Sequence, residues 1–460
     1  MSSPGAQRGG IRRDLAAQAV ATGMTAVAEF ATVFVLARLL GVEGWGMAAT
    51  ALATTTVVFA CLDQRWQDAM IRYHTMHAAR GQAALLHRDV WRIVRSDVTT
   101  GVVACVVAAA ALVGYALLRE GASAMLAVVP ACVGIVTAKN VGNASARSYL
   151  RVTNRFVPLA VVTLLGALAR CAAVGTVWLA GITTPSAALG MVLCGVAVSA
   201  VLLNAAALVA ARRDGMMQRA TSAGGAVARA EGAEQVEQAT QAAQTPDDLR
   251  TFLRHSWLSG IGLMPLRELD TMLLGFIAGP AAAGPYQVAK TMYTAADTTL
   301  GPLQLALQPR LAAAYHHGHG QRLARMVRTI CTWGVVFGCA VVLLVELAGP
   351  AVIRALLEER YQAAIPALQV MILAFPFSAA LLWVIPLCSA AGRPDLVARA
   401  SIGAGAVGMA LIAAGACVGD RGAAAGFAIT VALLLLWTVR LALRSPELAP
   451  LLRPTAPEAA

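Results

Sequence analysis

Ionisable side chains inside otherwise apolar segments are the residues of this chain whose types and spacing could do chemistry. A charge within a membrane-spanning helix costs about 2.5–3.5 kcal/mol on insertion scales, so it usually faces a protein interior or a water-filled cavity. The basic members are Arg170, Arg267 and Lys290, and the acidic members are Glu29, Glu268, Asp270, Asp297 and Glu346. Most of them fall between residues 267 and 297, and this crowding predicts a site.

Two kinds of chemistry fit this set. Arg267, Lys290 and Arg170 are the candidates for binding an anionic group in a central cavity. Asp270, Asp297, Glu29 and Glu268 are the candidates for taking up a coupling ion, H⁺ or Na⁺. The alternative is neutralisation within the protein, because Arg267 and Asp270 are three residues apart on a helix and could pair with each other. Glu346 could reach the membrane interface instead.

Composition requires that these charges be positioned by membrane-spanning helices. The 460 residues are 58% hydrophobic and only 13% charged, whereas soluble domains have about 45–50% apolar and about 25% charged residues. A net charge of +12 would suggest nucleic acid in a soluble protein, but here the basic residues fall in short blocks between apolar segments. The nine cysteines are scattered without framework spacing. The sequence predicts a multi-pass membrane protein with no nucleic-acid partner.

Twelve segments meet the length of about 20 apolar residues that a spanning helix needs. They fall near 15–37, 45–64, 98–118, 122–142, 156–180, 183–211, 254–278, 284–308, 327–348, 364–390, 396–418 and 422–443. With the N-terminus inside, 36 Lys and Arg residues divide strongly in favour of the inner loops. The outer loops hold only Arg38, Arg119, Arg354, Arg360 and Arg421. The fold class is therefore predicted as all-α, with twelve transmembrane helices and cytoplasmic N and C termini.

The segments form two groups of six around a polar interval. Residues 1–211 are predicted as an N-terminal lobe, 212–250 as a polar cytoplasmic linker, 251–445 as a C-terminal lobe and 446–460 as a disordered tail. Within the first long inner loop, 65–97, arginines and tryptophans occur at helical spacing. This loop is either a solvated connector or an amphipathic segment that contacts anionic lipid.

Paired glycines mark the first hairpin of each half. Gly41 and Gly46 are five residues apart, and so are Gly279 and Gly284. Glycine permits the positive φ or the close backbone approach that a tight turn between helices needs. The two turns are predicted to lie at the outer face, in lobes related by a pseudo-two-fold axis along the membrane normal. A histidine group at 316–319 lacks Cys or carboxylate partners, so no metal or other cofactor is predicted.

Two hairpins carry a resemblance to a known family. The first reads Arg38-Leu39-Leu40-Gly41-Val42-Glu43-Gly44-Trp45-Gly46, followed by Leu62-Asp63 and Ala69-Met70-Ile71-Arg72; the second reads Asp270-Thr271-Met272-Leu273-Leu274-Gly275, then Gly279 to Gly284, Tyr286, Ala289 and Gln308-Pro309-Arg310-Leu311. They resemble the polysaccharide flippases of the multidrug/oligosaccharidyl-lipid/polysaccharide (MOP) exporter superfamily. Pro285 and Gln64-Arg65-Trp66 depart from the family pattern.

The resemblance implies a transporter rather than an enzyme. It implies a monomer in the bacterial inner membrane that exports a polyprenyl-diphosphate-linked oligosaccharide by alternating access, beside other proteins of surface polysaccharide biosynthesis. Basic cavity residues would then hold the diphosphate. An ion-coupled multidrug antiporter of the same superfamily is the nearest alternative, since fold does not determine substrate. A polysaccharide polymerase or ligase would need a larger outer loop than 349–363.

Overall fold

The structure is a computed structural model, which describes residues 4–63, 70, 83–118, 122–153, 155–224, 257–258, 260–316, 320–391, 393–446 and 448–449. All regular elements in these ranges are helical. Eight of the helical stretches are long and apolar enough to cross a membrane: Gly23–Leu62, Val90–Leu117, Phe156–Leu179, Pro185–Asp214, Gly320–Leu357, Ala364–Cys388, Asp395–Ala416 and Asp420–Arg444. The predicted class, an all-helical multi-pass membrane protein, is confirmed for the described part of the chain.

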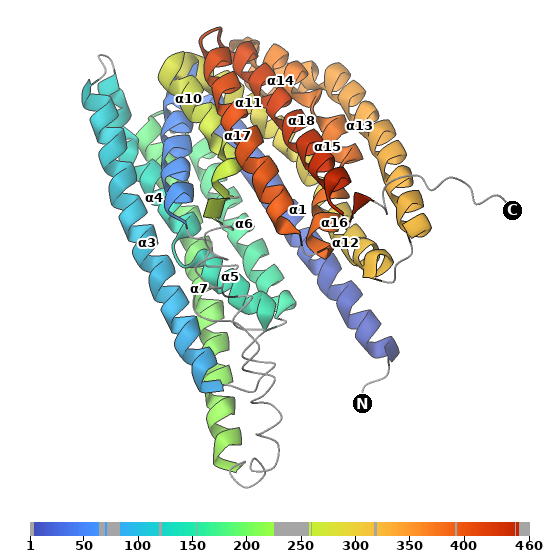
Figure 1. The fold of residues 1–460 in the computed structure, drawn as a ribbon. Coiled ribbons are helices and arrows are strands. Elements are labelled where there is room, and N and C mark those ends of the chain that lie inside the picture. Colours follow the sequence, from blue (N-terminus) through green and yellow to red (C-terminus); the bar gives the residue numbers. More distant parts are fainter. Residues whose placement is uncertain are drawn as a thin grey trace, which may run out of the picture.

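The first half of the chain begins with a long helical element that reverses direction. Its elements are α1 (Pro4–Leu62), α3 (Ala83–Leu118), η1 (Ala122–Ala127), α4 (Val129–Asn140), α5 (Asn143–Val152), α6 (Phe156–Leu179) and α7 (Pro185–Gly224). Gly41 interrupts α1 with φ 69°, and the chain turns back there, so that the remainder of α1 runs beside α4 (Figure 1).

The second half contains more short helices. Its elements are η2 (Pro265–Leu269), α10 (Asp270–Ile277), α11 (Pro280–Thr298), α12 (Leu300–His316), α13 (Gly320–Leu357), η3 (Glu359–Tyr361), α14 (Ala364–Ile372), α15 (Phe375–Ala380), α16 (Val384–Ala390), α17 (Pro394–Ala416) and α18 (Asp420–Arg444). The predicted span 364–390 is broken into α14, α15 and α16. Pro376 and Pro386 lie near these breaks, as expected for residues that lack a backbone N–H.

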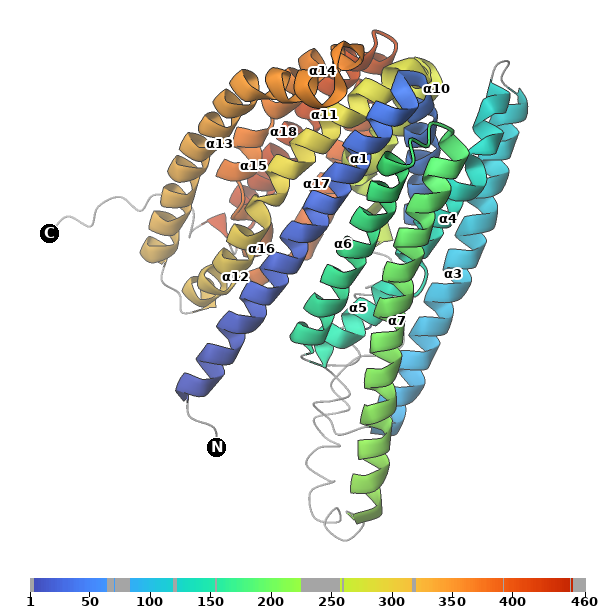
Figure 2. The ribbon, with the colours of Figure 1, turned by 180° about the vertical axis from the view of Figure 1, so that it is seen from behind.

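The two halves lie on opposite sides of the molecule. Figures 1 and 2 show α3 to α7 on one side and α12 to α18 on the other, with the first segment of α1 and α11 running between them. One apolar core joins both sides and includes Leu36, Trp45 and Leu189 from the first half and Tyr286 and Phe375 from the second. Side chains facing the membrane are apolar as well, which explains the many exposed Val and Leu residues.

The two glycine turns pack against each other. Gly279 has φ 92°, so it takes the same left-handed backbone region as Gly41. A Cβ placed on Gly46 would lie 1.8 Å from the carbonyl oxygen of Pro280, and one on Gly284 would lie 2.5 Å from that of Val42. The second glycine of each turn, Gly46 or Gly284, therefore packs directly against a backbone carbonyl group of the other turn. We call this region the turn end of the molecule.

Further contacts close the turn end. The Tyr361 hydroxyl donates to the Ala37 carbonyl oxygen at 2.9 Å, and the Arg38 guanidinium lies 3.2 Å from the Glu358 carboxylate. Both contacts join segments more than 300 positions apart in the chain. The turn at Gly41 is thus held both by the turn at Gly279 and by residues 358–361.

Several boundaries differ from the predicted ones. Helix α7 continues to Gly224, so residues 212–224 of the predicted linker are helical, because Arg, Met, Gln and Ala there are good helix formers. Helix α3 begins at Ala83 rather than 98, and α13 continues to Leu357 through most of the predicted outer loop. The rest of the linker, His317, His319 and most of the tail lie outside the described residues.

Candidate functional site

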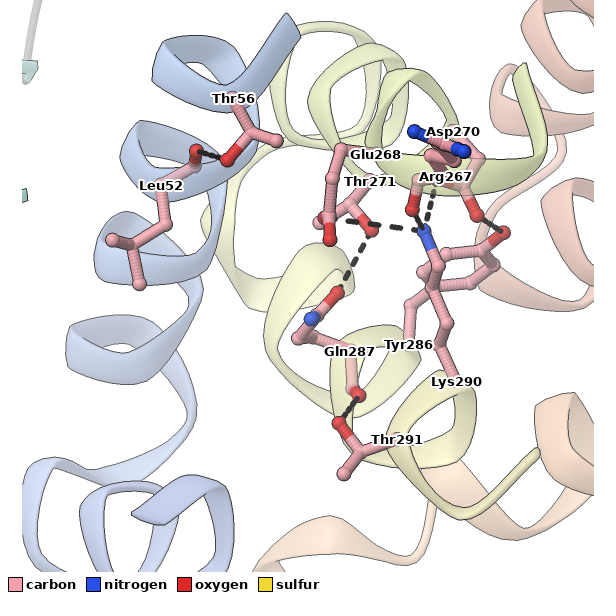
Figure 3. Close-up of polar contacts among 10 residues, drawn as sticks. All are labelled: Leu52, Thr56, Arg267, Glu268, Asp270, Thr271, Tyr286, Gln287, Lys290 and Thr291. Carbon is pink, nitrogen blue, oxygen red and sulfur yellow. Dashed lines mark hydrogen bonds and ion pairs between the residues drawn. The ribbon is translucent and has the colours of Figure 1, made fainter. Parts of the chain in front are cut away.

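A buried polar network in the second half contains Lys290 and Asp270. The Lys290 ammonium lies 2.6 Å from the Asp270 carboxylate and 3.9 Å from that of Glu268. It also donates to the backbone carbonyl oxygen of Arg267. Tyr286 donates to the second Asp270 oxygen at 2.7 Å. Figure 3 shows these side chains converging between η2–α10 and α11.

Local backbone geometry explains how this network is assembled. The turn Pro265–Leu269 is a π-helix, which is wider than an α-helical turn and is often found at functional sites. Within this turn, the backbone carbonyl oxygen of Arg267 accepts a hydrogen bond from the Lys290 ammonium. Asp270 is fully buried and Lys290 nearly so, and burial of a charged pair requires the close hydrogen bonding that is present here.

Lys290 and Arg267, the two predicted basic residues of the second half, have different surroundings. Lys290 is surrounded by Asp270, Glu268 and a carbonyl oxygen, so its charge is compensated within the network. Arg267 lines a pocket of about 140 Å³ together with Glu268. Asp270 pairs with Lys290, which is 20 positions away in the chain.

This first pocket lies between the two halves of the chain. Besides Arg267 and Glu268 it is lined by Asp63, Asp97 and Asn140, from the end of α1, from α3 and from α4. The Ser145 hydroxyl donates to Asp97 at 2.6 Å. Asp63 and Asp97 were not among the candidates predicted from sequence. Asp97 falls in the predicted inner loop 65–97, and Asp63 is the second-last residue of the predicted span 45–64, so neither stands out as a charge in the middle of an apolar segment.

A second charged pocket lies within the first half. It measures about 260 Å³ and is lined by Glu29, Lys139, Asn143, Arg147 and Arg170, with Thr25, Thr163 and Ser199 among the other polar residues. The Glu29 carboxylate lies 3.3 Å from the Arg170 guanidinium and 3.6 Å from the Lys139 ammonium. The Glu29 carboxylate is thus shared by Arg170 and Lys139, two of the three cations that line the pocket. We call Lys139, Arg147 and Arg170 the basic cluster.

The basic cluster has unused capacity for an anion. The Arg170 side chain is only 11% exposed, and its Nε has no hydrogen-bond partner in the described residues. Arg147, on the short helix α5, is exposed, and the neighbouring positive charges of Arg151 and Arg170 act unfavourably on its own charge. An anion placed among these side chains would relieve both the repulsion and the unpaired donor.

The two charged groups face each other across the halves of the chain. Glu268 is within electrostatic range of Lys139 and Glu29 as well as of Lys290. Glu29 and Arg170 are in direct contact, and Glu268 of the Lys290 network lies within electrostatic range of Glu29. Asp297 stays apart. It lies on α11 seven residues beyond Lys290, or about 10 Å along the helix axis.

Lys139 and Arg147 were missed as site residues. Charge counting along the sequence assigns both to an inner loop, yet Lys139 lies in the last turn of α4 and Arg147 lies on α5. Gly142, with φ 73°, connects the two helices. A signal was present in the sequence, because Lys139, Asn143 and Arg147 are spaced at four-residue intervals, which places polar groups on one side of a helical segment.

Comparison with known proteins identifies the fold. Neither protein-family models nor curated protein sequences match the chain. Among solved structures, the inward-facing conformation of a multidrug resistance MATE family transporter of the MOP superfamily is similar, with a TM-score of 0.61, 14% identity, and coverage of 94% of this chain and 96% of that one. The lipid II flippase MurJ in an inward closed conformation gives 0.60 and 11%, covering 95% and 89%.

A third similar structure is a MOP superfamily transporter from Pyrococcus furiosus, described as having a binding pocket of reversed polarity. It gives a TM-score of 0.60 at 13% identity and covers 94% of this chain and 96% of that one. The chain thus has the same multi-pass helical fold as these proteins. More particularly, it is the fold shared by the MATE and MurJ transporters of the MOP superfamily.

Proposed function

We propose that this chain is a MOP superfamily exporter that moves a polyprenyl-diphosphate-linked oligosaccharide across the bacterial cytoplasmic membrane. The observation that carries the proposal is the basic cluster, in which Lys139, Arg147 and Arg170 surround one carboxylate, Glu29, in a pocket. A diphosphate offers several acceptor oxygens and at least two negative charges. Guanidinium and ammonium donors suit such a group well.

The proposed cycle is alternating access with twelve spanning helices and both termini in the cytoplasm. The turn end, which holds Gly41 and Gly279, would then face outward. Its backbone contacts support an outward-closed state, in which the charged pockets admit cargo from the cytoplasmic side. A monomer is sufficient for this cycle, because both charged groups come from one chain. Lys290 would act within the buried network, and Arg170 would act on the diphosphate.

A cation-coupled multidrug antiporter is the second candidate. The pocket between the halves favours it, because Asp63, Asp97 and Glu268 all line that space with a single arginine. Carboxylates would attract a cationic drug. The two candidates differ in which pocket carries cargo: the basic cluster for the glycan lipid, and the acidic pocket for the drug.

The glycan proposal predicts that the basic cluster is needed for export. Replacing Arg170 and Lys139 together by Gln should reduce export of a labelled diphosphate-linked oligosaccharide lipid about a hundred-fold, since each lost charged hydrogen bond costs about 1.5–3 kcal/mol. Arg399→Gln is the matched control, because that side chain is 71% exposed on α17. Rates are measured in vesicles containing equal amounts of inserted protein. Wild-type rates in the double variant would contradict the proposal, and drug efflux without glycan export would favour the second candidate.

The Glu268–Lys290–Asp270 group is the proposed site of ion coupling. Glu268 is the partly exposed member and lines the pocket between the halves, so it can exchange an ion with water. Glu268→Gln should make export insensitive to an imposed proton or sodium gradient. Asp297→Asn, on the same helix as Lys290 but outside the group, should keep the wild-type response. A full gradient response in Glu268→Gln would contradict this assignment.

A further inference from the structure

A third pocket lies at the far end of the first half, between α3, α5 and α7. It measures about 270 Å³, below the roughly 300–1,000 Å³ of sites that enclose a drug-sized ligand. Its walls are mostly apolar or small and include Val90, Val94, Ala146, Leu208 and Ala211. None of the residues assigned to the basic cluster or to the Lys290 network lines it. Its size and lining fit part of an apolar chain.

The polar groups in its walls already bind one another. Tyr149 donates to Asp214 at 2.7 Å, and the Arg155 guanidinium contacts the other Asp214 oxygen at 2.5 Å. Asn204 donates to the Asn143 side-chain oxygen at 2.7 Å. Because these donors and acceptors are satisfied within the protein, a ligand gains most by covering the apolar surface between them. The pocket therefore selects for hydrocarbon.

The surroundings of the pocket identify the kind of hydrocarbon. Trp91 lines it and is 51% exposed, as tryptophan commonly is at a membrane interface. Exposed arginines flank the lining on both long helices, namely Arg92 and Arg95 on α3 and Arg212 and Arg213 on α7. Further along α3, Val98 and Val102 are exposed, as expected for a surface that faces lipid chains.

We propose that this pocket binds an anionic phospholipid of the surrounding membrane, with one acyl chain between α3 and α7 and the phosphate among the arginines. Arginines close to an anionic membrane surface each add to binding, and an apolar pocket beside them adds specificity for a lipid over a soluble anion. The site is separate from the proposed transport pathway. It gives a role to the start of α3, where arginines and tryptophan occur together.

Quenching of Trp91 fluorescence tests the site directly. The full chain is reconstituted into phosphatidylcholine vesicles that contain a small fraction of phosphatidylglycerol brominated on the acyl chain. The difference between wild type and Trp91→Phe isolates the signal of Trp91. We expect brominated phosphatidylglycerol to quench this signal at a mole fraction at least ten-fold lower than brominated phosphatidylcholine does. Equal quenching by the two lipids would overturn the proposal.

Two variants separate the chain and head-group contacts. Ala211→Leu fills part of the pocket at a position that is only partly buried and should weaken the preferential quenching. Replacing Arg92, Arg95 and Arg212 by Gln should raise the half-quenching mole fraction on the order of ten-fold. The matched control replaces the exposed arginines at 322, 325 and 328 of α13 and should change nothing. An equal effect of both triple replacements would show only general surface charge and would also overturn the proposal.

Discussion

Replacing Asp270 by Ala is expected to destabilise the protein by about 3–5 kcal/mol, because it leaves a buried ammonium without its closest counter-charge. Asp270 is fully buried and Lys290 is 7% exposed at the side chain. Glu268, at 3.9 Å, is too far for a hydrogen bond to the ammonium. The Tyr286 hydroxyl would also lose its acceptor. The loss should therefore exceed that of an ordinary core truncation in the same helix.

Denaturant unfolding of the purified protein in mixed micelles measures this effect. The double replacement Asp270→Leu with Lys290→Met removes both charges and should recover most of the stability, since a buried ion pair contributes little relative to apolar residues of similar volume. Asp297→Asn serves as the control. If Asp270→Ala unfolds at the wild-type denaturant concentration, or if the double variant is the less stable one, the buried pair is not a coupled unit.

The pairing of Lys290 with Asp270 could not be derived from helical spacing. Regular α-helical geometry favours contacts between residues three or four apart, which points to Arg267 and Asp270. The π-turn at Pro265–Leu269 changes the register just before Asp270, and Lys290 reaches across from α11 to both η2 and α10. The sequence marks this region as charged and proline-containing, but the partner choice depends on how two helices pack.

The basic cluster shows a related limit of sequence reasoning. Arg170 and Glu29 are recognisable as charges inside apolar segments, and the structure places them 3.3 Å apart. Lys139 and Arg147 occur where a spanning segment ends, and charge counting along the chain assigns such residues to loops. Their role in the pocket depends on the bend at Gly142, which separates α4 from α5. Hydropathy separates these residues into charges within spanning segments and charges in loops, but tertiary contacts bring them into one pocket.

The large-scale organisation was accessible because it depends on hydropathy alone. The predicted spans 156–180 and 422–443 differ from α6 and α18 by only a few residues. Ends such as that of α7 were misplaced because a helix does not stop at the membrane surface when its polar residues also favour helix. Length and composition thus predict which segments cross the membrane, but capping and packing determine at which residue each helix ends.

Gly46→Ala is expected to separate the two turns and open the turn end of the molecule. The new methyl group would lie 1.8 Å from a backbone oxygen of Pro280, where no side-chain rotation can relieve the clash. Gly23→Ala is the matched control in the same element, because nothing lies within 4 Å of a Cβ there. Alanine at an unobstructed helical site should stabilise by about 0.5–1 kcal/mol. The two substitutions thus have the same chemistry and opposite expected effects.

A cysteine at position 283 reports on the turn end. Ala283 is completely buried beside Gly284, so in a background without the nine native cysteines, Ala283→Cys should resist a membrane-impermeant maleimide. Adding Gly46→Ala should make it reactive in protein that still elutes as a folded species, whereas adding Gly23→Ala should leave it protected. Protection in the folded Gly46→Ala protein would mean that the turns tolerate the methyl group while still in contact. Reactivity would mean that the close approach of the two turns is needed to keep this end closed, and that the contacts of Tyr361 and Arg38 do not keep it closed without that approach.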